Sequence, residues 1–89
     1  MEEWQILNTA VLCQAPNTSG LYAFIVDEQV MYIGRTKCFP IRLPNHPKLK
    51  RLRANGDVEV RILEGWDAYD TERVWVRKYS PRYNIEHLN

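Results

Sequence analysis

Two apolar runs separated by three polar residues constrain the fold of this 89-residue chain more than any other feature. Residues 21–26 read LYAFIV, residues 30–33 read VMYI, and the polar triplet Asp27-Glu28-Gln29 joins them. Apolar runs of this length on either side of a short polar segment predict a β-hairpin. Because 89 residues have room for one small domain, we expect residues 1–89 to form a single unit that includes this hairpin.

A third strand is predicted after the hairpin, where Val58, Val60 and Ile62 alternate with polar residues. Period-two alternation is typical of a strand with one buried face. The first nineteen residues contain either a short helix or a strand around residues 4–12, so their structure stays open. The predicted fold class is therefore α/β (α+β), with a three-stranded, mainly antiparallel sheet flanked by short helices.

Short helices are predicted in the second half of the chain. Three prolines limit any helix between residues 35 and 47 to about one turn. Residues 48–54 predict a short basic helix that ends before Gly56. Residues 67–79 predict a longer helix with Asp67 as its N-cap.

Glu72 interrupts the apolar face of that last predicted helix. Helical spacing places it on one face with Ala68, Trp75, Val76 and Tyr79. A carboxylate within an apolar stripe costs several kcal/mol to desolvate unless a partner compensates it. Glu72 therefore indicates a metal ion, an arginine partner or an open cleft, and a buried or half-buried salt bridge is the purely structural alternative.

Positive charge is concentrated in one segment, although the formal net charge is only +1. Residues 1–34 carry four acids and no base, whereas residues 35–53 carry seven bases and no acid. The bases are Arg35, Lys37, Arg42, Lys48, Lys50, Arg51 and Arg53. A local positive field attracts polyanions by releasing their counterions, so nucleic acid is the predicted partner. A solvated basic loop without a partner is the alternative.

Composition disfavours several classes of protein. No apolar run is long enough to span a bilayer, and the amino end lacks a secretory signal pattern, so we expect a soluble, cytoplasmic protein without membrane contact. Cys13 and Cys38 are too few for a disulfide scaffold and lack the spacing of a zinc site. No positioned base is evident for a cysteine nucleophile.

The hairpin carries two short motifs that resemble a known family. Gly20-Leu21-Tyr22 on the first strand and Tyr32-Ile33-Gly34 on the second are similar to the paired motif of the GIY-YIG nuclease superfamily. Further matching positions follow in order, namely Arg42, His46, Glu72 on the last long helix, and Asn84 in a Pro-x-x-Asn turn. The pattern extends over residues 20–84, about three quarters of the chain.

The resemblance implies a divalent-metal-dependent endonuclease. It assigns Tyr22 and Tyr32 to the active cleft, Arg42 to the scissile phosphate, Glu72 to a single Mg²⁺ or Mn²⁺ ion, and Asn84 to support of the site. Arg35 and Lys37 match positions that are often basic in similar excision-repair domains, and His46 matches a position that holds tyrosine or histidine there. The predicted nucleic-acid-binding residues are Gly34, Arg35, Lys37, Lys48, Lys50, Arg51 and Arg53.

The chemistry of phosphodiester hydrolysis is compatible with this set, because it needs an activated water and stabilisation of charge at phosphorus. We predict that Tyr32 is the general base and that Tyr22 hydrogen-bonds to it or to the water, although the reverse assignment stays open. An unperturbed phenol has a pKa of about 10, so forming the phenolate at pH 7 costs about 4 kcal/mol. Positive charge from Arg35, Lys37, Arg42 and the metal must reduce that cost.

Two other functions remain possible for the same fold. One is a nucleic-acid-binding module that has lost cleavage, and the other is an inhibitor or host-interaction protein from a mobile element. DNA is favoured over RNA as the substrate. Because 89 residues leave no room for an appended DNA-binding domain, we expect a homodimer or a protein partner to confer specificity, or recognition of nucleic-acid structure alone.

Overall fold

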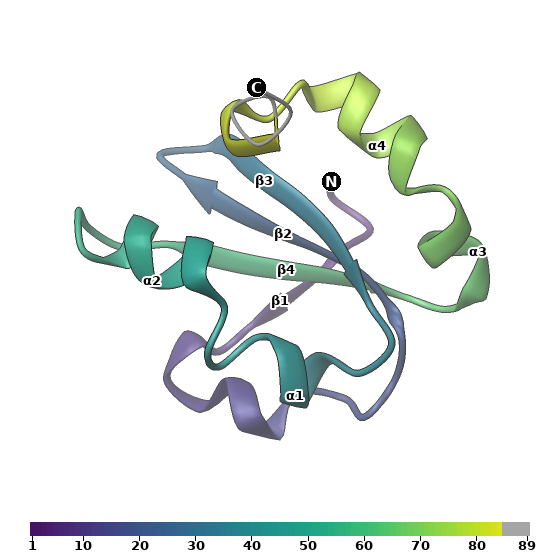
Figure 1. Cartoon of the computed structure of the whole chain (residues 1–89), viewed down its shortest axis with the longest axis horizontal. Coiled ribbons are helices and arrows are strands. Elements are labelled where there is room, and N and C mark those ends of the chain that lie inside the picture. The colour runs from purple at the N-terminus through teal and green to yellow at the C-terminus, as the bar shows by residue number, and fades with distance from the viewer. Residues whose placement is uncertain (85–89) are drawn as a thin grey trace.

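The predicted hairpin forms one side of an antiparallel sheet. In the computed structural model, which describes residues 1–84, strand β2 (Gly20–Val26) pairs with β3 (Gln29–Thr36) and with β4 (Glu59–Glu64). Strand β1 (Gln5–Leu7) pairs with the other side of β4. The strand order is β1-β4-β2-β3, so β1 and β3 are the edge strands (Figure 1).

The sheet has four strands rather than the predicted three, while the predicted fold class is confirmed. The additional strand, β1, has three residues and none of them is buried. Its own sequence therefore carries no strand periodicity, and it is defined by its pairing with β4. A 3-10 helix, η1 (Thr9–Gln14), follows it and is capped by Asn8, whose side chain accepts a hydrogen bond from the Ala10 N–H.

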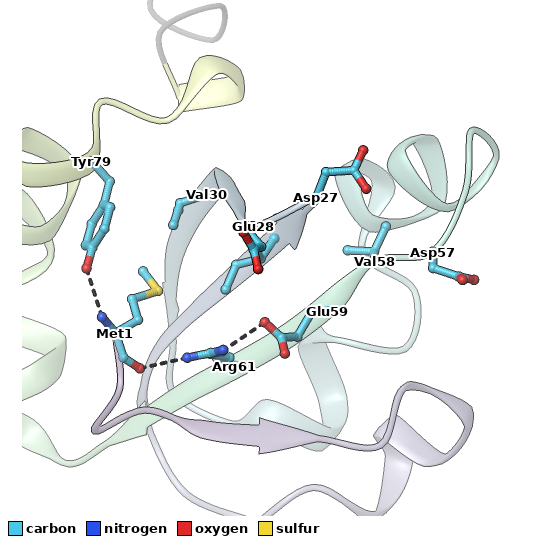
Figure 2. Close-up of a pocket in the computed structure, with 10 residues that line it drawn as sticks. Met1, Asp27, Glu28, Val30, Asp57, Val58, Glu59, Arg61 and Tyr79 are labelled. Atoms are coloured by element: carbon cyan, nitrogen blue, oxygen red, sulfur yellow. Dashed lines mark hydrogen bonds and ion pairs between the residues drawn. The ribbon is translucent and has the colours of Figure 1, made fainter.

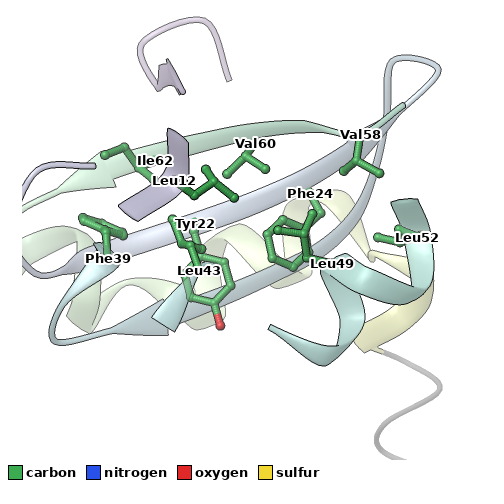
Figure 3. Packing of buried hydrophobic residues seen from close by; sticks show 10 residues of the cluster. All are labelled: Leu12, Tyr22, Phe24, Phe39, Leu43, Leu49, Leu52, Val58, Val60 and Ile62. Atoms are coloured by element: carbon green, nitrogen blue, oxygen red, sulfur yellow. The ribbon is translucent and has the colours of Figure 1, made fainter. Parts of the chain in front are cut away.

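Helices α1 (Phe39–Arg42) and α2 (Pro47–Arg53) cover one face of the sheet. Helix α1 is a single turn, as the prolines predict, and Pro47 begins α2 at a position where its missing N–H has no helical partner to lose. Figure 3 shows the apolar cluster beneath them, which comprises Leu12, Tyr22, Phe24, Phe39, Leu43, Leu49, Leu52, Val58, Val60 and Ile62. The alternating apolar residues that predict the third strand all face this cluster, which confirms that prediction.

Helices α3 (Trp66–Asp70) and α4 (Glu72–Tyr79) cover the opposite face (Figure 1). They pack on a second cluster whose buried members are Trp4, Leu21, Ala23, Ile33 and Ala68. Within residues 1–84, no helix combines the length and the apolar character needed to cross a bilayer.

The prediction of one continuous helix over residues 67–79 is wrong. Thr71, with φ −101° and ψ 13°, separates α3 from α4, and its hydroxyl donates a hydrogen bond to the Ala68 carbonyl at 3.0 Å. Helix α3 begins after Gly65 rather than after Asp67. Glu72 is consequently the first residue of α4, where the positive end of the helix dipole stabilises a carboxylate, instead of the middle of an apolar stripe.

A β-bulge at Met31 determines the face on which Tyr32 lies. The register of the hairpin shifts by one residue just beyond the Phe24–Tyr32 pair, which leaves Met31 as an extra residue on β3. Side chains alternate between the faces of a strand, so a one-residue insertion exchanges the faces. With the bulge, Tyr32 shares the face of Phe24 and Tyr22; without it, Tyr32 would lie opposite Ala23 on the other face.

Candidate active site

The hydroxyl of Tyr22 joins the strand β2 to the start of helix α2. It projects beyond the apolar cluster (Figure 3) and lies 2.9 Å from Nε2 of His46, which is buried. The other ring nitrogen of His46, Nδ1, accepts a hydrogen bond from the Lys48 N–H at 3.1 Å and so caps α2. In a neutral imidazole the accepting nitrogen carries no proton, so we assign the proton to Nε2, which donates it to Tyr22.

The protonation state of His46 agrees with this assignment. Burial, together with the positive charges of Arg42 and Lys48, lowers the pKa of His46 to about 4. The ring is therefore neutral at pH 7. Because the Tyr22 oxygen already accepts a hydrogen bond from His46, the proton of the Tyr22 hydroxyl is available for another oxygen.

Tyr32 lies beside Tyr22, with 6.1 Å between the ring centroids. Burial raises the pKa of Tyr32, and the negative charge of Glu72 raises it further. A hydrogen bond from Tyr22 and the charge of Arg42 act in the opposite direction. Burial and the neighbouring Tyr32 raise the pKa of Tyr22 well above its usual range. Tyr22 thus lies between His46, to which it is hydrogen-bonded, and Tyr32, whose ionisation it influences.

Two cations approach this group of rings. Arg42, the exposed last residue of α1, exerts its charge on Tyr22, Tyr32 and His46. The Nζ atom of Lys48 lies 4.8 Å from the centroid of the Tyr32 ring. Both charges favour an ionised phenol over a neutral one.

Glu72 reaches the same region from the helix layer on the opposite face. Its side chain is 29% exposed, and its Oε1 atom lies 3.8 Å from Nε of Arg35. The guanidinium of Arg35 also lies 4.8 Å from the centroid of the Tyr69 ring. An ion pair of this length leaves the carboxylate accessible to other ligands.

Glu72 offers one accessible carboxylate, a ligand type that suits a hard divalent cation. Mg²⁺ commonly binds through one or two carboxylates and completes its shell with water and substrate phosphates. Among residues 1–84, no group of three or more His, Cys, Asp or Glu side chains is arranged to enclose a metal. A cation at this site would therefore depend on Glu72, water and the substrate.

Asn84 occupies the free edge of β3. Its Oδ1 accepts a hydrogen bond from the Ile33 N–H and its Nδ2 donates one to the Ile33 carbonyl, both at 2.8 Å. Edge strands present such backbone groups without a partner strand. Since Ile33 lies between Tyr32 and Gly34, these two bonds hold the segment of β3 that carries the site.

Gly34 has a packing role, and its nucleic-acid contact stays a prediction. It is buried directly under the ring of Tyr22, with no room for a Cβ atom. The other predicted nucleic-acid-binding residues keep accessible side chains: Lys48 is half-buried beside Tyr32, and Arg35, Lys37, Lys50, Arg51 and Arg53 are exposed.

The predicted catalytic residues thus come together at the β3 edge, whereas Lys50, Arg51 and Arg53 lie further along α2. Two contributors were not expected from the sequence. Tyr69 lies under Arg35 and carries no motif that indicates this contact. The bulge at Met31 could have been suspected, since a regular two-residue hairpin would put Tyr22 and Tyr32 on opposite faces.

A hollow of about 610 Å³ beside the hairpin turn is separate from this site (Figure 2). Its lining includes four carboxylates, from Asp27, Glu28, Asp57 and Glu59, and none of the predicted site residues. Arg61 is held within it by Glu59 at 2.9 Å. The excess of negative charge disfavours a polyanion here, so we do not assign nucleic acid to this hollow.

Comparison with known proteins gives a consistent result. No protein-family profile matches the chain. UvrABC system protein C from Fervidobacterium nodosum is 33% identical in an alignment 86 positions long, and the match covers 89% of this chain and 15% of that protein. The protein of the same name from Rickettsia prowazekii is 29% identical in an alignment 93 positions long, and the match covers 85% of this chain and 14% of that protein. The chain therefore spans about one seventh of the length of these curated relatives.

Two crystal structures of the GIY-YIG N-terminal endonuclease domain of UvrC from Thermotoga maritima share the fold. Each is a tyrosine-to-phenylalanine point mutant bound to the catalytic divalent cation of that domain. One has a TM-score of 0.66 and 26% identity, and the other 0.62 and 24%; each match covers 81% of this chain and 88% of the other. With its paired motifs on adjacent strands, this chain belongs to the GIY-YIG endonuclease superfamily.

Proposed function

We propose that this chain is a divalent-metal-dependent endonuclease that hydrolyses phosphodiester bonds in nucleic acid, with residues 20–84 as its catalytic unit. The main support is that the charge of Glu72, on helix α4, acts on the phenol of Tyr32, on strand β3. A carboxylate and a phenol beside several cations form a set that can hold a metal and activate water.

Tyr32 is the proposed general base, and Tyr22 supports it. Because the Tyr22 oxygen accepts a hydrogen bond from His46, its own proton can be donated to Tyr32 and stabilise the phenolate. For an unperturbed phenol, ionisation at pH 7 costs about 4 kcal/mol. Burial of Tyr32 adds to this cost, so the charges of Arg42 and Lys48 are needed to offset it.

Glu72 is the proposed ligand of the cation, with Mg²⁺ and Mn²⁺ as the candidates. When bound, the cation supplies Lewis-acid stabilisation of charge on the phosphoryl oxygens. Arg42 is proposed to bind the scissile phosphate, since a guanidinium can donate two parallel hydrogen bonds to it. The exposed cations of α2 extend the positive surface along the nucleic-acid backbone.

DNA is the proposed substrate class, and the UvrC domains that the chain resembles are named endonucleases. The chain matches about 15% of the length of a curated relative, so the specificity of the larger protein is not transferred to it. A second copy of this chain or a protein partner is proposed to confer recognition of particular sites or structures.

A cleavage assay with branched and linear DNA and with single-stranded RNA tests this function. We expect product with MgCl2 or MnCl2 and none with EDTA. Tyr32→Phe and Glu72→Gln should each reduce the rate by about 100-fold or more. Tyr79→Phe and Glu3→Gln, which make the same chemical changes elsewhere, should leave the rate unchanged.

Two results would contradict the proposal. One is a folded wild-type protein that cleaves none of these substrates with either metal. The other is a Glu72→Gln variant as active as the wild type. Salt-dependent binding of nucleic acid without any cleavage would instead identify the chain as a binding module.

A further inference from the structure

Trp66 is a large aromatic side chain that the proposed catalysis does not use. It is the first residue of α3 and is 73% exposed, whereas Trp4 is 3% exposed and Trp75 packs against the second apolar cluster. Gly65, with φ +117°, introduces Trp66 through a backbone conformation that residues with a Cβ rarely adopt. The chain therefore holds this indole at the surface by a glycine-specific turn.

Trp66 lines a hollow of about 510 Å³ together with Lys37 from the end of β3. The floor is the polar loop Asn17, Thr18 and Ser19, and Thr18 donates a hydrogen bond to the Glu64 carboxylate at 2.6 Å. The lining therefore has one lysine, Lys37, and one carboxylate, that of Glu64. This balance of charge suits an uncharged ring lying on the indole, with the attached phosphate near Lys37, better than it suits phosphate alone.

Helix α3 carries both Trp66 and Tyr69, and Tyr69 lies near the candidate metal ligand Glu72 through Arg35. Tyr69 lies three residues after Trp66, so the two rings are neighbours on the helix surface. Tyr69 contacts Arg35, and Arg35 pairs with Glu72. Lys37 follows β3 directly and is three residues from Gly34, which lies under the ring of Tyr22.

We propose that Trp66 is a stacking platform for one unpaired nucleobase of the substrate. Stacking on an indole requires a base that is free of its partner strand, so this site selects single-stranded, flapped or branched nucleic acid over continuous duplex. The inference rests on the proposed function, because it extends the same nucleic-acid site.

Equilibrium binding in EDTA tests this inference without any cleavage. The probes are fluorescein-labelled 15-nucleotide single strands of DNA and of RNA, and a DNA duplex of the same sequence. Trp66→Ala should weaken single-strand binding by about 5- to 100-fold and change duplex binding by less than about twofold. Trp66→Phe should restore most of the affinity. Ile6→Ala removes another exposed apolar side chain, on the edge strand β1, and should have no effect.

The salt dependence separates stacking from charge. Lys37→Ala should reduce the magnitude of the slope of log affinity against log salt by about 1, because one fewer counterion is released. Trp66→Ala should leave the slope unchanged. Probes that each lack one base should also be measured with the wild-type protein. Its affinity should fall as much as it does in Trp66→Ala for only one position of the missing base. The DNA and RNA arms report which nucleic acid supplies the base.

The inference is overturned if Trp66→Ala binds single strands as tightly as the wild type, or if it weakens duplex and single-strand binding equally. It is also overturned if the wild-type protein binds no single strand. These outcomes are distinct from failure of the proposed function, which is judged by metal-dependent cleavage. A Trp66-dependent affinity in a protein that never cleaves would support the stacking site and reject the nuclease.

Discussion

Gly34 leaves the space that the ring of Tyr22 occupies, because a Cβ atom at residue 34 would lie 2.5 Å from both Cζ and Oη of that ring. The ring cannot easily move away. Its centroid lies 5.4 Å from that of Phe24, and its hydroxyl is bonded to His46. Gly34, the last residue of the second motif, thus determines where the phenol of the first motif is placed.

Gly34→Ala is therefore expected to destabilise the fold by about 1 to 3 kcal/mol, as overpacking of a core does. It should also reduce cleavage, because the Tyr22 hydroxyl is displaced from its neighbours. Urea unfolding measures the first effect. In a Tyr22→Leu background, which lacks the ring, Gly34→Ala should cost much less; an equal cost in both backgrounds would show that the clash lies elsewhere.

His46 is expected to make folding stability depend on pH between about 6.5 and 4. Folding lowers its pKa, so the unfolded chain binds more protons in this window, and the free energy of unfolding falls as the pH falls. The stability is fully present above pH 6.5. At 1.36 kcal/mol per pKa unit, the loss is at most about 3 kcal/mol. Urea unfolding at a series of pH values measures it.

Two substitutions at residue 46 separate the two hydrogen bonds of the ring. Glutamine does not titrate and can still donate an N–H to Tyr22, so His46→Gln should flatten the pH dependence in this window. Asparagine can still cap the Lys48 N–H but is too short to reach Tyr22, so His46→Asn should lose more cleavage activity than His46→Gln. Identical pH profiles for wild type and His46→Gln would exclude His46 as the source.

Local signals in the sequence were sufficient for much of the fold. The hairpin, the single turn of α1 and the alternation of Val58, Val60 and Ile62 each depend on neighbouring residues, and each is confirmed. Strand β1 and the break at Thr71 depend on contacts with distant segments or on one residue's backbone angles. Neither has a periodic pattern that a reader of the sequence could follow.

The candidate site was predictable in composition but not in geometry. The order of residues from Gly20 to Asn84 supplied the residue types through a family resemblance. The face on which Tyr32 lies depends on a single extra residue in β3, and the direction of the Tyr22 hydroxyl depends on the cap of α2. Such details follow from register and packing, which no short motif encodes.

Asn84→Ala is expected to loosen the edge of β3 around the site. It leaves the Ile33 N–H and carbonyl without their side-chain partner, at a cost of about 1 to 3 kcal/mol. Hydrogen exchange should report faster exchange at the Ile33 amide, while the Val60 amide on the central strand β4 should change only with global stability. Asn84→Asp keeps the acceptor but places a carboxylate oxygen against the Ile33 carbonyl, so it should not restore protection. Equal acceleration at Ile33 and Val60 would contradict a local role.

Replacement of Asp27-Glu28 by Asn-Gly is expected to stabilise the protein. These two residues form the hairpin turn with φ angles of 49° and 65°. The left-handed conformation costs about 1 to 2 kcal/mol for a residue with a Cβ, and the cost is smaller for Asp than for Glu. Asn-Gly is the pair of residues that such turns favour. A gain of about 1 kcal/mol would raise Tm by roughly 4 to 8 °C for a chain of this size.

The single substitutions show where that gain originates. Most of it should come from Glu28→Gly and little from Asp27→Asn, because Asp already tolerates the left-handed region. Cleavage should be unchanged, since the turn belongs to the acidic end of the hairpin and carries no predicted catalytic residue. The bulge at Met31 lies between the turn and Tyr32 and fixes the face on which the proposed base lies. A loss of cleavage together with a gain in Tm would therefore mean that the turn also sets the register at Met31.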